Sequence, residues 1–130
     1  MIAVDTNVLV RYFVGDDAQQ SRLSTDFLED EARLALPAFV STVTLVEMLW
    51  VLADCYRVEK DKQRELVQEI LASAHFVVEH ENAVTKALAL RHGDIADRII
   101  HLVGASFGCS HTVTFDKKFA RIDGVSLLTS

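Results

Sequence analysis

Four acidic residues stand out among the nineteen in the chain because each lies within or directly beside an apolar run. They are Asp5, Glu47, Asp97 and Asp116. Carboxylates placed against a hydrophobic core are unfavourable unless they are paired or bind cations. Carboxylate oxygens are also the ligands that hard cations such as Mg²⁺ and Mn²⁺ prefer. The four acids together therefore indicate a metal site.

Each of the four acids also has a purely structural explanation, as a residue that caps a helix. Thr44 and Glu47 have the spacing of a capping box, and Asp94 with Asp97 fits the first turn of a helix. Few basic residues are placed to neutralise four acids, with Arg98 the clearest case and Lys117 another. Taken together, the four acids therefore favour bound cations over helix capping alone.

Two of the acids end predicted strands. Residues 2–4 form a short apolar run typical of a buried strand, and residues 7–14 continue as a helix, which leaves Asp5 at their junction. Residues 111–115 alternate as a strand does and stop at Asp116. In a parallel sheet the carboxyl ends of the strands share one edge, where ligands bind. We expect Asp5 and Asp116 to lie there.

The rest of the chain alternates between expected helices and strands. We expect helices over residues 41–56, 61–74, 82–92 and 95–107, a turn of helix at 117–120, and a helix capped by Asp16 or Asp17 that runs to residue 31. We expect strands over residues 34–36, 76–78 and 125–128. This alternation predicts an α/β fold with a parallel sheet, as a single domain over residues 1–130.

Composition limits the classes of protein. Half of the 130 residues are hydrophobic, which disfavours disorder, and no apolar run reaches the length of a membrane span. No secretory signal is visible, so we expect a cytoplasmic protein with Cys55 and Cys109 as buried, reduced thiols. The net charge of −6 argues against broad electrostatic binding of nucleic acid, but it allows a local basic patch or acids neutralised by metal.

The helix expected over residues 41–56 is apolar on nearly every side. Such a helix is buried on more than one side, which indicates core on one face and a subunit contact on another. We therefore expect a homodimer.

The acids lie in an ordered series of motifs that resembles the PIN-domain nucleases, most closely the bacterial VapC toxins. The matching segments are VDTNV at residues 4–8, TLVE at 44–47, DIADRII at 94–100, GC at 108–109 and TFDKKF at 114–119. They cover nearly the whole chain.

The resemblance implies an RNase with a three-layer α/β/α sandwich around a mostly parallel central sheet. It implies Mg²⁺ or Mn²⁺ at a carboxylate site, an RNA substrate, a homodimer and a small antitoxin protein as inhibitor. Carried over, the catalytic and metal-binding acids are Asp5, Glu47, Asp97 and Asp116. Thr114 matches a residue that forms hydrogen bonds within the site, and the resemblance implies the same role for Thr6 or Asn7. Asp94 is an accessory residue of the site.

Other residues add less. The five histidines show no metal-ligand spacing, although His101 follows Asp97 by one helical turn. Basic residues near Asp116 are candidates for contacts with RNA phosphates or are simply exposed at a helix end. They are Lys117, Lys118 and Arg121.

Two other functions remain open. Asp5 could be the phospho-acceptor of a phosphate-signalling or phosphatase domain, with Lys117 or Lys118 as the late lysine, although a second aspartate two residues after Asp5 is absent. Alternatively, the chain is a catalytically silent interaction subunit whose acids only cap helices.

Overall fold

The computed structural model describes residues 1–129, with only the backbone of Arg33. The chain forms two compact units, Met1–Glu79 and His80–Ser130. Each unit contains its own parallel strands and helices, which confirms the predicted α/β class. The expectation of one domain stays a prediction. Within residues 1–129 no helix is both long and apolar enough to cross a membrane.

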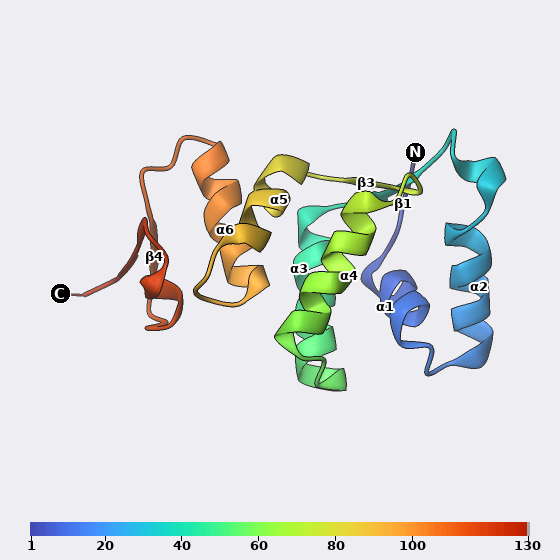
Figure 1. Cartoon of the computed structure of the whole chain (residues 1–130), viewed down its shortest axis with the longest axis horizontal. Helices are drawn as coiled ribbons and strands as arrows, with labels where there is room; N and C mark the ends of the chain where they lie inside the picture. The colour runs from blue at the N-terminus through green and yellow to red at the C-terminus, as the bar shows by residue number, and fades with distance from the viewer. Residues whose placement is uncertain (130) are drawn as a thin grey trace. The chain divides into compact units, whose positions relative to one another are not determined.

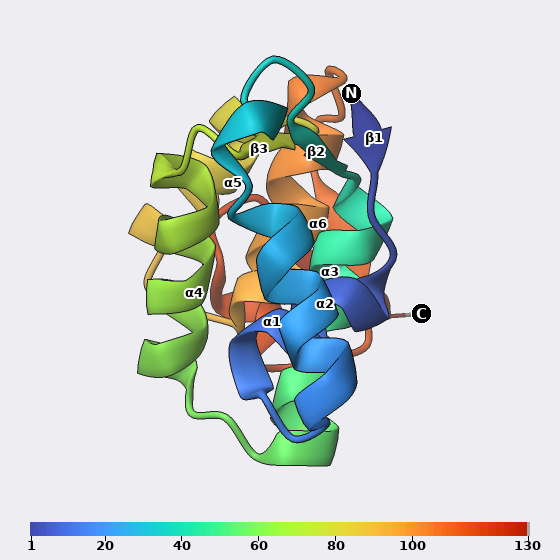
Figure 2. The same ribbon diagram turned by 90° about the vertical axis from the view of Figure 1, so that its right-hand side faces the viewer.

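Unit 1 joins a three-stranded parallel sheet to four helices (Figure 1). Its strands pair in the order β1 (Ile2–Ala3), β2 (Ala38–Val40) and β3 (Phe76–Val78). Its helices are α1 (Thr6–Val14), α2 (Ala18–Leu28), α3 (Thr42–Tyr56) and α4 (Lys60–Ala72), with a 3₁₀ turn at Glu31–Arg33. The turned view in Figure 2 agrees with Figure 1 that the strands lie at one end of these helices.

Helix α3 is amphipathic despite its composition. Its buried side chains are Leu45, Val46, Met48, Leu49 and Leu52. The opposite face exposes Val43 and Trp50 to 75% and 50%, with Glu47 between them. One face therefore belongs to the core, and the other is an apolar surface around an acid.

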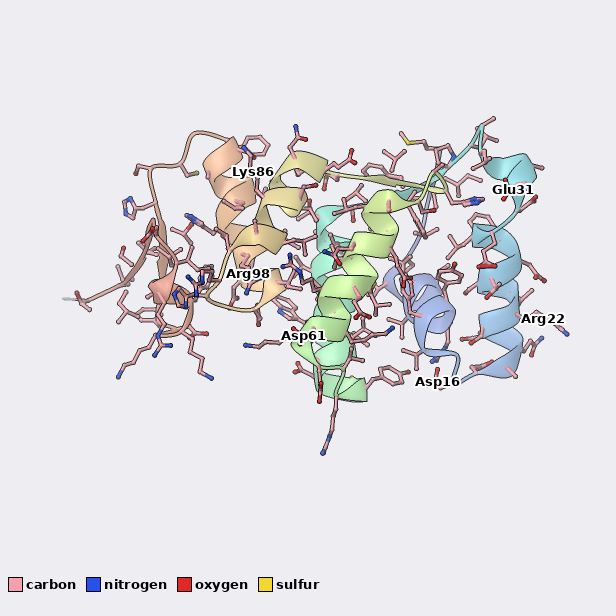
Figure 3. The ribbon with its side chains drawn as sticks, viewed as in Figure 1. Asp16, Arg22, Glu31, Asp61, Lys86 and Arg98 are labelled. Carbon is pink, nitrogen blue, oxygen red and sulfur yellow. The ribbon has the colours of Figure 1, made fainter. Side chains whose placement is uncertain are left out.

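Helix α2 presents a charged side to solvent. Asp17 caps it by accepting a hydrogen bond from the backbone N–H of Gln20 at 2.9 Å. Arg22 projects from it into solvent (Figure 3). On this helix Leu23 is exposed, whereas Leu28 is buried.

Unit 2 pairs two helices with a two-stranded parallel sheet. The helices α5 (Glu81–Ala89) and α6 (Ile95–Ser106) pack on each other, and β4 (Thr112–Thr114) pairs with β5 (Val125–Leu127). A 3₁₀ turn, η2, spans Phe119–Arg121. Phe119, Ile122 and Val125 form a small buried cluster in contact with Leu90.

Most predicted elements are confirmed, but the strand expected over residues 34–36 is wrong. Leu34 and Leu36 are exposed, and the strand begins after Pro37, at Ala38. Proline has no N–H to donate to a neighbouring strand. The carbonyl of Pro37 instead accepts a hydrogen bond from the N–H of Ile2 at 3.2 Å, so pairing with β1 starts there.

Two local predictions also need correction. Cys55 and Cys109 are free thiols, as expected, but both are exposed rather than buried. The helix expected over residues 82–92 is α5, which spans only Glu81–Ala89 and has His80 as its N-cap, with a φ of 55°. At the end of α6, Gly108 adopts a φ of 86°, as expected for a glycine that closes a helix.

Candidate active site

Asp5 sits between β1 and α1, where the sequence placed it. Its Oδ1 accepts a hydrogen bond from the backbone N–H of Thr6 at 2.7 Å, so it is the N-cap of α1. The residue is exposed, and its other carboxylate oxygen bonds to no residue in the described part of the chain. Asp5 thus combines a capping role with one oxygen that is free for a ligand.

Glu47 and Asp5 line the same pocket in unit 1. This pocket has a volume of about 280 Å³, and its walls also include Thr6, Asn7 and Arg11. The capping-box explanation for Glu47 is wrong, because the N-cap of α3 is Ser41, whose Oγ accepts the N–H of Thr44 at 3.1 Å. Glu47 lies one helical turn after Thr44 and is exposed, so its carboxylate is available to a ligand.

Asp97 lies in a crowded acidic group in unit 2. Asp94 is the N-cap of α6, and its Oδ1 accepts a hydrogen bond from the N–H of Asp97 at 2.8 Å. Partial burial, together with the negative charges of Asp94 and Asp116, raises the pKa of Asp97 to about 6. The capping geometry predicted for this pair is confirmed, and charge crowding accompanies it.

Thr114 and Asp116 are linked at the end of β4. The Oγ1 of Thr114 accepts a hydrogen bond from the N–H of Asp116 at 3.0 Å. Asp116 Oδ1 in turn accepts N–H groups from Lys118 at 2.8 Å and Phe119 at 3.3 Å. The hydroxyl of Thr114 therefore fixes the backbone of the acid, whose side chain caps the following turn.

The structure thus brings the candidates together in two sets. Asp5 and Glu47 share the pocket in unit 1, and Asp94, Asp97 and Asp116 interact electrostatically in unit 2. Among residues 1–129, no group of three or more acids, histidines or cysteines has the geometry of a formed metal site.

His101 packs inside unit 2. It is 8% exposed, and its Nδ1 lies 2.8 Å from the hydroxyl oxygen of Thr112 at the start of β4. Gly124, with a φ of 88°, lies so close that a Cβ there would approach the imidazole Cε1 to 3.1 Å. These contacts favour the packing role for His101 over a place among the candidate acids.

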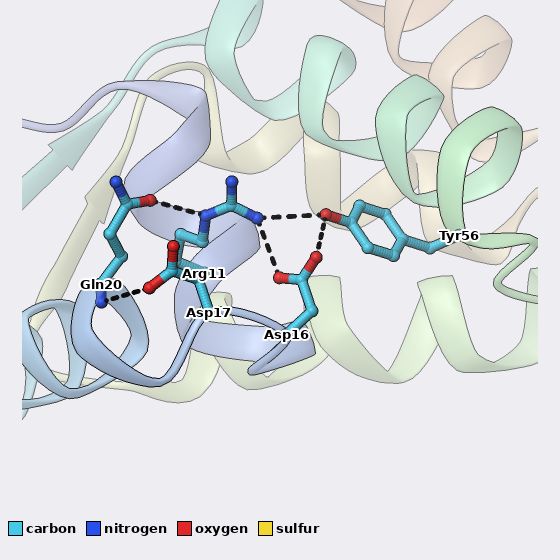
Figure 4. A network of polar contacts seen from close by, with 5 residues as sticks. All are labelled: Arg11, Asp16, Asp17, Gln20 and Tyr56. Atoms are coloured by element: carbon cyan, nitrogen blue, oxygen red, sulfur yellow. Dashed lines mark hydrogen bonds and ion pairs between the residues drawn. The ribbon is translucent and has the colours of Figure 1, made fainter.

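Sequence reasoning missed Arg11, which lines the unit 1 pocket with Asp5 and Glu47. Its guanidinium bonds to Gln20, Asp16 and Tyr56, as Figure 4 shows. The available signal was that Arg11 is the one charged residue in the segment that forms α1. Its partners come from other elements, so spacing along the sequence did not single it out.

Comparison with known proteins gives two matches. The family model described as "PIN domain" matches residues 2–125. The chain is also similar to a VapC ribonuclease of Aquifex aeolicus (strain VF5), with 24% identity over 125 residues, which cover 94% of this chain and 92% of the relative. The family match spans the two units and includes every candidate acid.

Proposed function

This chain belongs to the PIN-domain family, as its motifs predicted, and we propose that it is a metal-dependent endoribonuclease that acts as the toxin of a toxin–antitoxin pair. The proposal draws on the similarity to a VapC ribonuclease along nearly the whole chain. PIN nucleases generally use divalent metal ions, and we propose Mg²⁺ or Mn²⁺ for this chain. An RNase acts where cellular RNA is, so the cytoplasm is its proposed location.

The single observation that supports this function best is the crowding around Asp97. A carboxylate that is half-buried near two other acids is unfavourable in its charged form, and its pKa rises accordingly to about 6. A divalent cation relieves such crowding, because its charge favours the ionised acids. The oxygen donors present also suit Mg²⁺ and Mn²⁺ rather than a soft metal.

We assign the metal-binding and catalytic roles to Asp5, Glu47, Asp97 and Asp116. When bound, the ions would supply an activated water and neutralise charge on the scissile phosphate. The protein's own contribution is orientation: Asp94 holds the first turn of α6 that carries Asp97, and Thr114 holds the backbone of Asp116. Thr114 is thus a positioning residue.

RNA cleavage by the purified protein tests this function. Cellular RNA should be cut in Mg²⁺ or Mn²⁺ and left intact in excess chelator. Restoration of cleavage when metal is added back excludes irreversible damage by the chelator. Intact RNA under every metal condition, with a folded protein, would contradict the proposal.

The two alternative functions gain no support from the comparisons, which match a nuclease family. The phospho-acceptor function still has a direct test. Incubation with acetyl phosphate followed by mass analysis should leave the mass of the chain unchanged. A phosphate adduct on Asp5 would revive that alternative.

We propose that a small antitoxin inhibits the enzyme by inserting an arginine among the acids, because guanidinium and carboxylate groups form strong paired hydrogen bonds. Inhibitor binding should then weaken when Asp97 and Asp116 are both changed to Asn. Calorimetry with the wild type and the double variant measures this. Equal affinities would place inhibition elsewhere on the protein.

We also propose a homodimer, supported by the exposed apolar face of α3. Val43 and Trp50 lie seven residues apart on that face and are 75% and 50% exposed. Exposed apolar side chains are typical of interaction surfaces, and the proposed contact is made by Val43 and Trp50 on either side of Glu47, which lines the pocket with Asp5. Light scattering at micromolar concentration should give twice the mass of the chain, and Trp50→Lys should shift the protein toward a monomer.

A further inference from the structure

Hydrogen bonds along one edge of the Arg11 guanidinium hold the group in a fixed orientation (Figure 4). Its Nε donates a hydrogen bond to Gln20 Oε1 at 2.7 Å, and its Nη1 donates to Asp16 Oδ1 at 2.8 Å. Nη1 also contacts the hydroxyl oxygen of Tyr56 at 3.2 Å, and that hydroxyl donates to Asp16 Oδ2 at 2.7 Å. Side chains from α2, from α3 and from the α1–α2 connection thus fix a cation at the C-terminal half of α1.

The other edge of the same guanidinium carries N–H donors that the network in Figure 4 does not use. Nη2 carries two N–H groups, and no acceptor in the described part of the chain bonds to them. The side chain of Arg11 is 28% exposed, so solvent or a ligand reaches it. The hydrogen bonds to Tyr56 and Asp16 raise the pKa of Arg11, which keeps it charged.

This cation lines a pocket that also contains two of the proposed catalytic acids. Asp5, Glu47 and Arg11 belong to the walls of one pocket of about 280 Å³. Two carboxylates alone repel an anion. A fixed guanidinium among them presents a fork of N–H donors, a geometry that matches the oxygens of a phosphate.

We propose that Arg11 binds a phosphate of the RNA beside the scissile bond, through Nη2, and that Asp16 and Tyr56 position it. This inference rests on the proposed function, because it assigns part of the substrate to a site that contains Asp5 and Glu47. Contacts to phosphates set the register of a nucleic acid on a protein without reading its sequence. Arg11 therefore contributes to substrate binding in general rather than to the choice of cleavage sequence.

Steady-state cleavage of a labelled single-stranded RNA oligonucleotide, measured across a range of salt concentrations, tests the assignment. Arg11→Gln should raise KM roughly ten- to a hundredfold, the scale of one hydrogen bond to a charged group. It should also flatten the dependence of log(kcat/KM) on log[salt] by about 0.7, the contribution of one phosphate contact on a single strand. Arg11→Lys should retain the salt dependence but lose part of the affinity, because lysine lacks the fork.

Arg22→Gln is the matched control, because it removes an exposed arginine from α2 (Figure 3). It should leave both KM and the salt dependence at their wild-type values. If Arg11→Gln fails to fold, Tyr56→Phe decides, since it retains the guanidinium and removes one of its supports. We expect that variant to raise KM with little change in kcat and an unchanged salt dependence.

Unchanged KM and salt dependence in folded Arg11→Gln, with an active wild type, would overturn this inference alone. The same holds if Arg11→Gln does not fold and Tyr56→Phe has wild-type kinetics. A variant that cleaves RNA normally but loses the antitoxin would assign Arg11 to a protein carboxylate instead. A wild type that cleaves no RNA overturns the proposed function itself, so the two failures are distinguishable.

Discussion

Acidic residues meet different surroundings in the two units. In unit 1, Asp5 and Glu47 share a pocket with Arg11, whose guanidinium is fixed by Asp16 and Tyr56. In unit 2, the charges that act most strongly on Asp97 are those of other acids, and its pKa rises to about 6. One acidic pair thus has a cation of the protein beside it, whereas the other acidic group is crowded with like charges.

This difference indicates different roles for the two acidic groups. The acids of unit 1 can meet an anionic substrate with help from Arg11. In unit 2, a bound cation would relieve the crowding that raises the pKa of Asp97. Removing single charges from each unit should therefore have different effects on stabilisation by metal and on pH dependence, whereas both removals should reduce activity.

The largest expected effect is on catalysis. Asp5→Asn and Asp97→Asn should each reduce RNA cleavage about a hundred- to a thousandfold, the scale of several kcal/mol of lost metal assistance. Asparagine is as good an N-cap as aspartate, so Asp5→Asn should leave α1 intact. Gel assays, with circular dichroism as the folding control, measure this. Full activity in either variant would remove that unit from the proposed site.

The next effect concerns stabilisation by metal. At a Mg²⁺ concentration about a hundredfold above its dissociation constant, the wild type should gain about 2.7 kcal/mol in free energy of unfolding. Asp97→Asn should lose most of this gain, because the crowded acids are those most relieved by a cation. Urea melts with Mg²⁺ and with chelator provide the comparison. If Mg²⁺ stabilises the wild type and the variant equally, Asp97 is not a ligand.

A smaller effect is expected from pH in the absence of metal. The pKa of Asp97 in the folded protein, about 6, lies above its ordinary value of 3.8, so the folded state holds the proton more tightly. This contribution is fully present below the ordinary pKa and is lost as the pH rises through the folded-state value. Because Asp97 is only partly buried, the wild type should lose about 1 kcal/mol between pH 4 and 7.

Asp97→Asn is the direct control for this pH effect. It lacks the titrating group, so its stability curve should be flatter over the same interval. At pH 7 without metal it should be as stable as the wild type or more stable, by on the order of 1 kcal/mol. A variant that is less stable there, yet cleaves RNA, would reduce Asp97 to a structural residue of the first turn of α6.

The smallest effect separates charge from capping at Asp94. Asp94→Asn keeps a good N-cap and should change the free energy of unfolding by only a few tenths of a kcal/mol, whereas Asp94→Ala should cost about 1 kcal/mol. The Asn variant should also lower the pKa of Asp97, because one of the two acidic neighbours loses its charge. An NMR titration of the Asp97 carboxyl carbon measures that shift. An unchanged pKa would show that the charge of Asp94 does not contribute to the shift, which burial dominates.

Much of the fold follows from local sequence rules. Asp5, Ser41 and Asp94 each cap a helix where the apolar pattern predicts a start, because capping depends on neighbouring residues. The misplaced strand at residues 34–36 shows the limit. Hydrophobicity alone favoured these residues, whereas the pairing of β2 with β1 begins only beyond Pro37.

The candidate site was less predictable than the elements that carry it. Of the acids that the motifs selected, Asp5 and Glu47 line one pocket, and Asp97 is crowded by other acids; their catalytic role stays a prediction. The Arg11 network escaped prediction because its contact with Tyr56 joins residues 45 positions apart. Contacts of that kind arise from the packing of α1 against α3, which no local pattern encodes.

The two exposed thiols have a practical consequence for the proposed homodimer. Cys55 and Cys109 are both accessible, so air oxidation can join two chains through a covalent bond. Such a species has the mass of a dimer without any packing between the α3 faces. Only a doubled mass that persists in excess reductant, and that Trp50→Lys reduces, represents association through Val43 and Trp50.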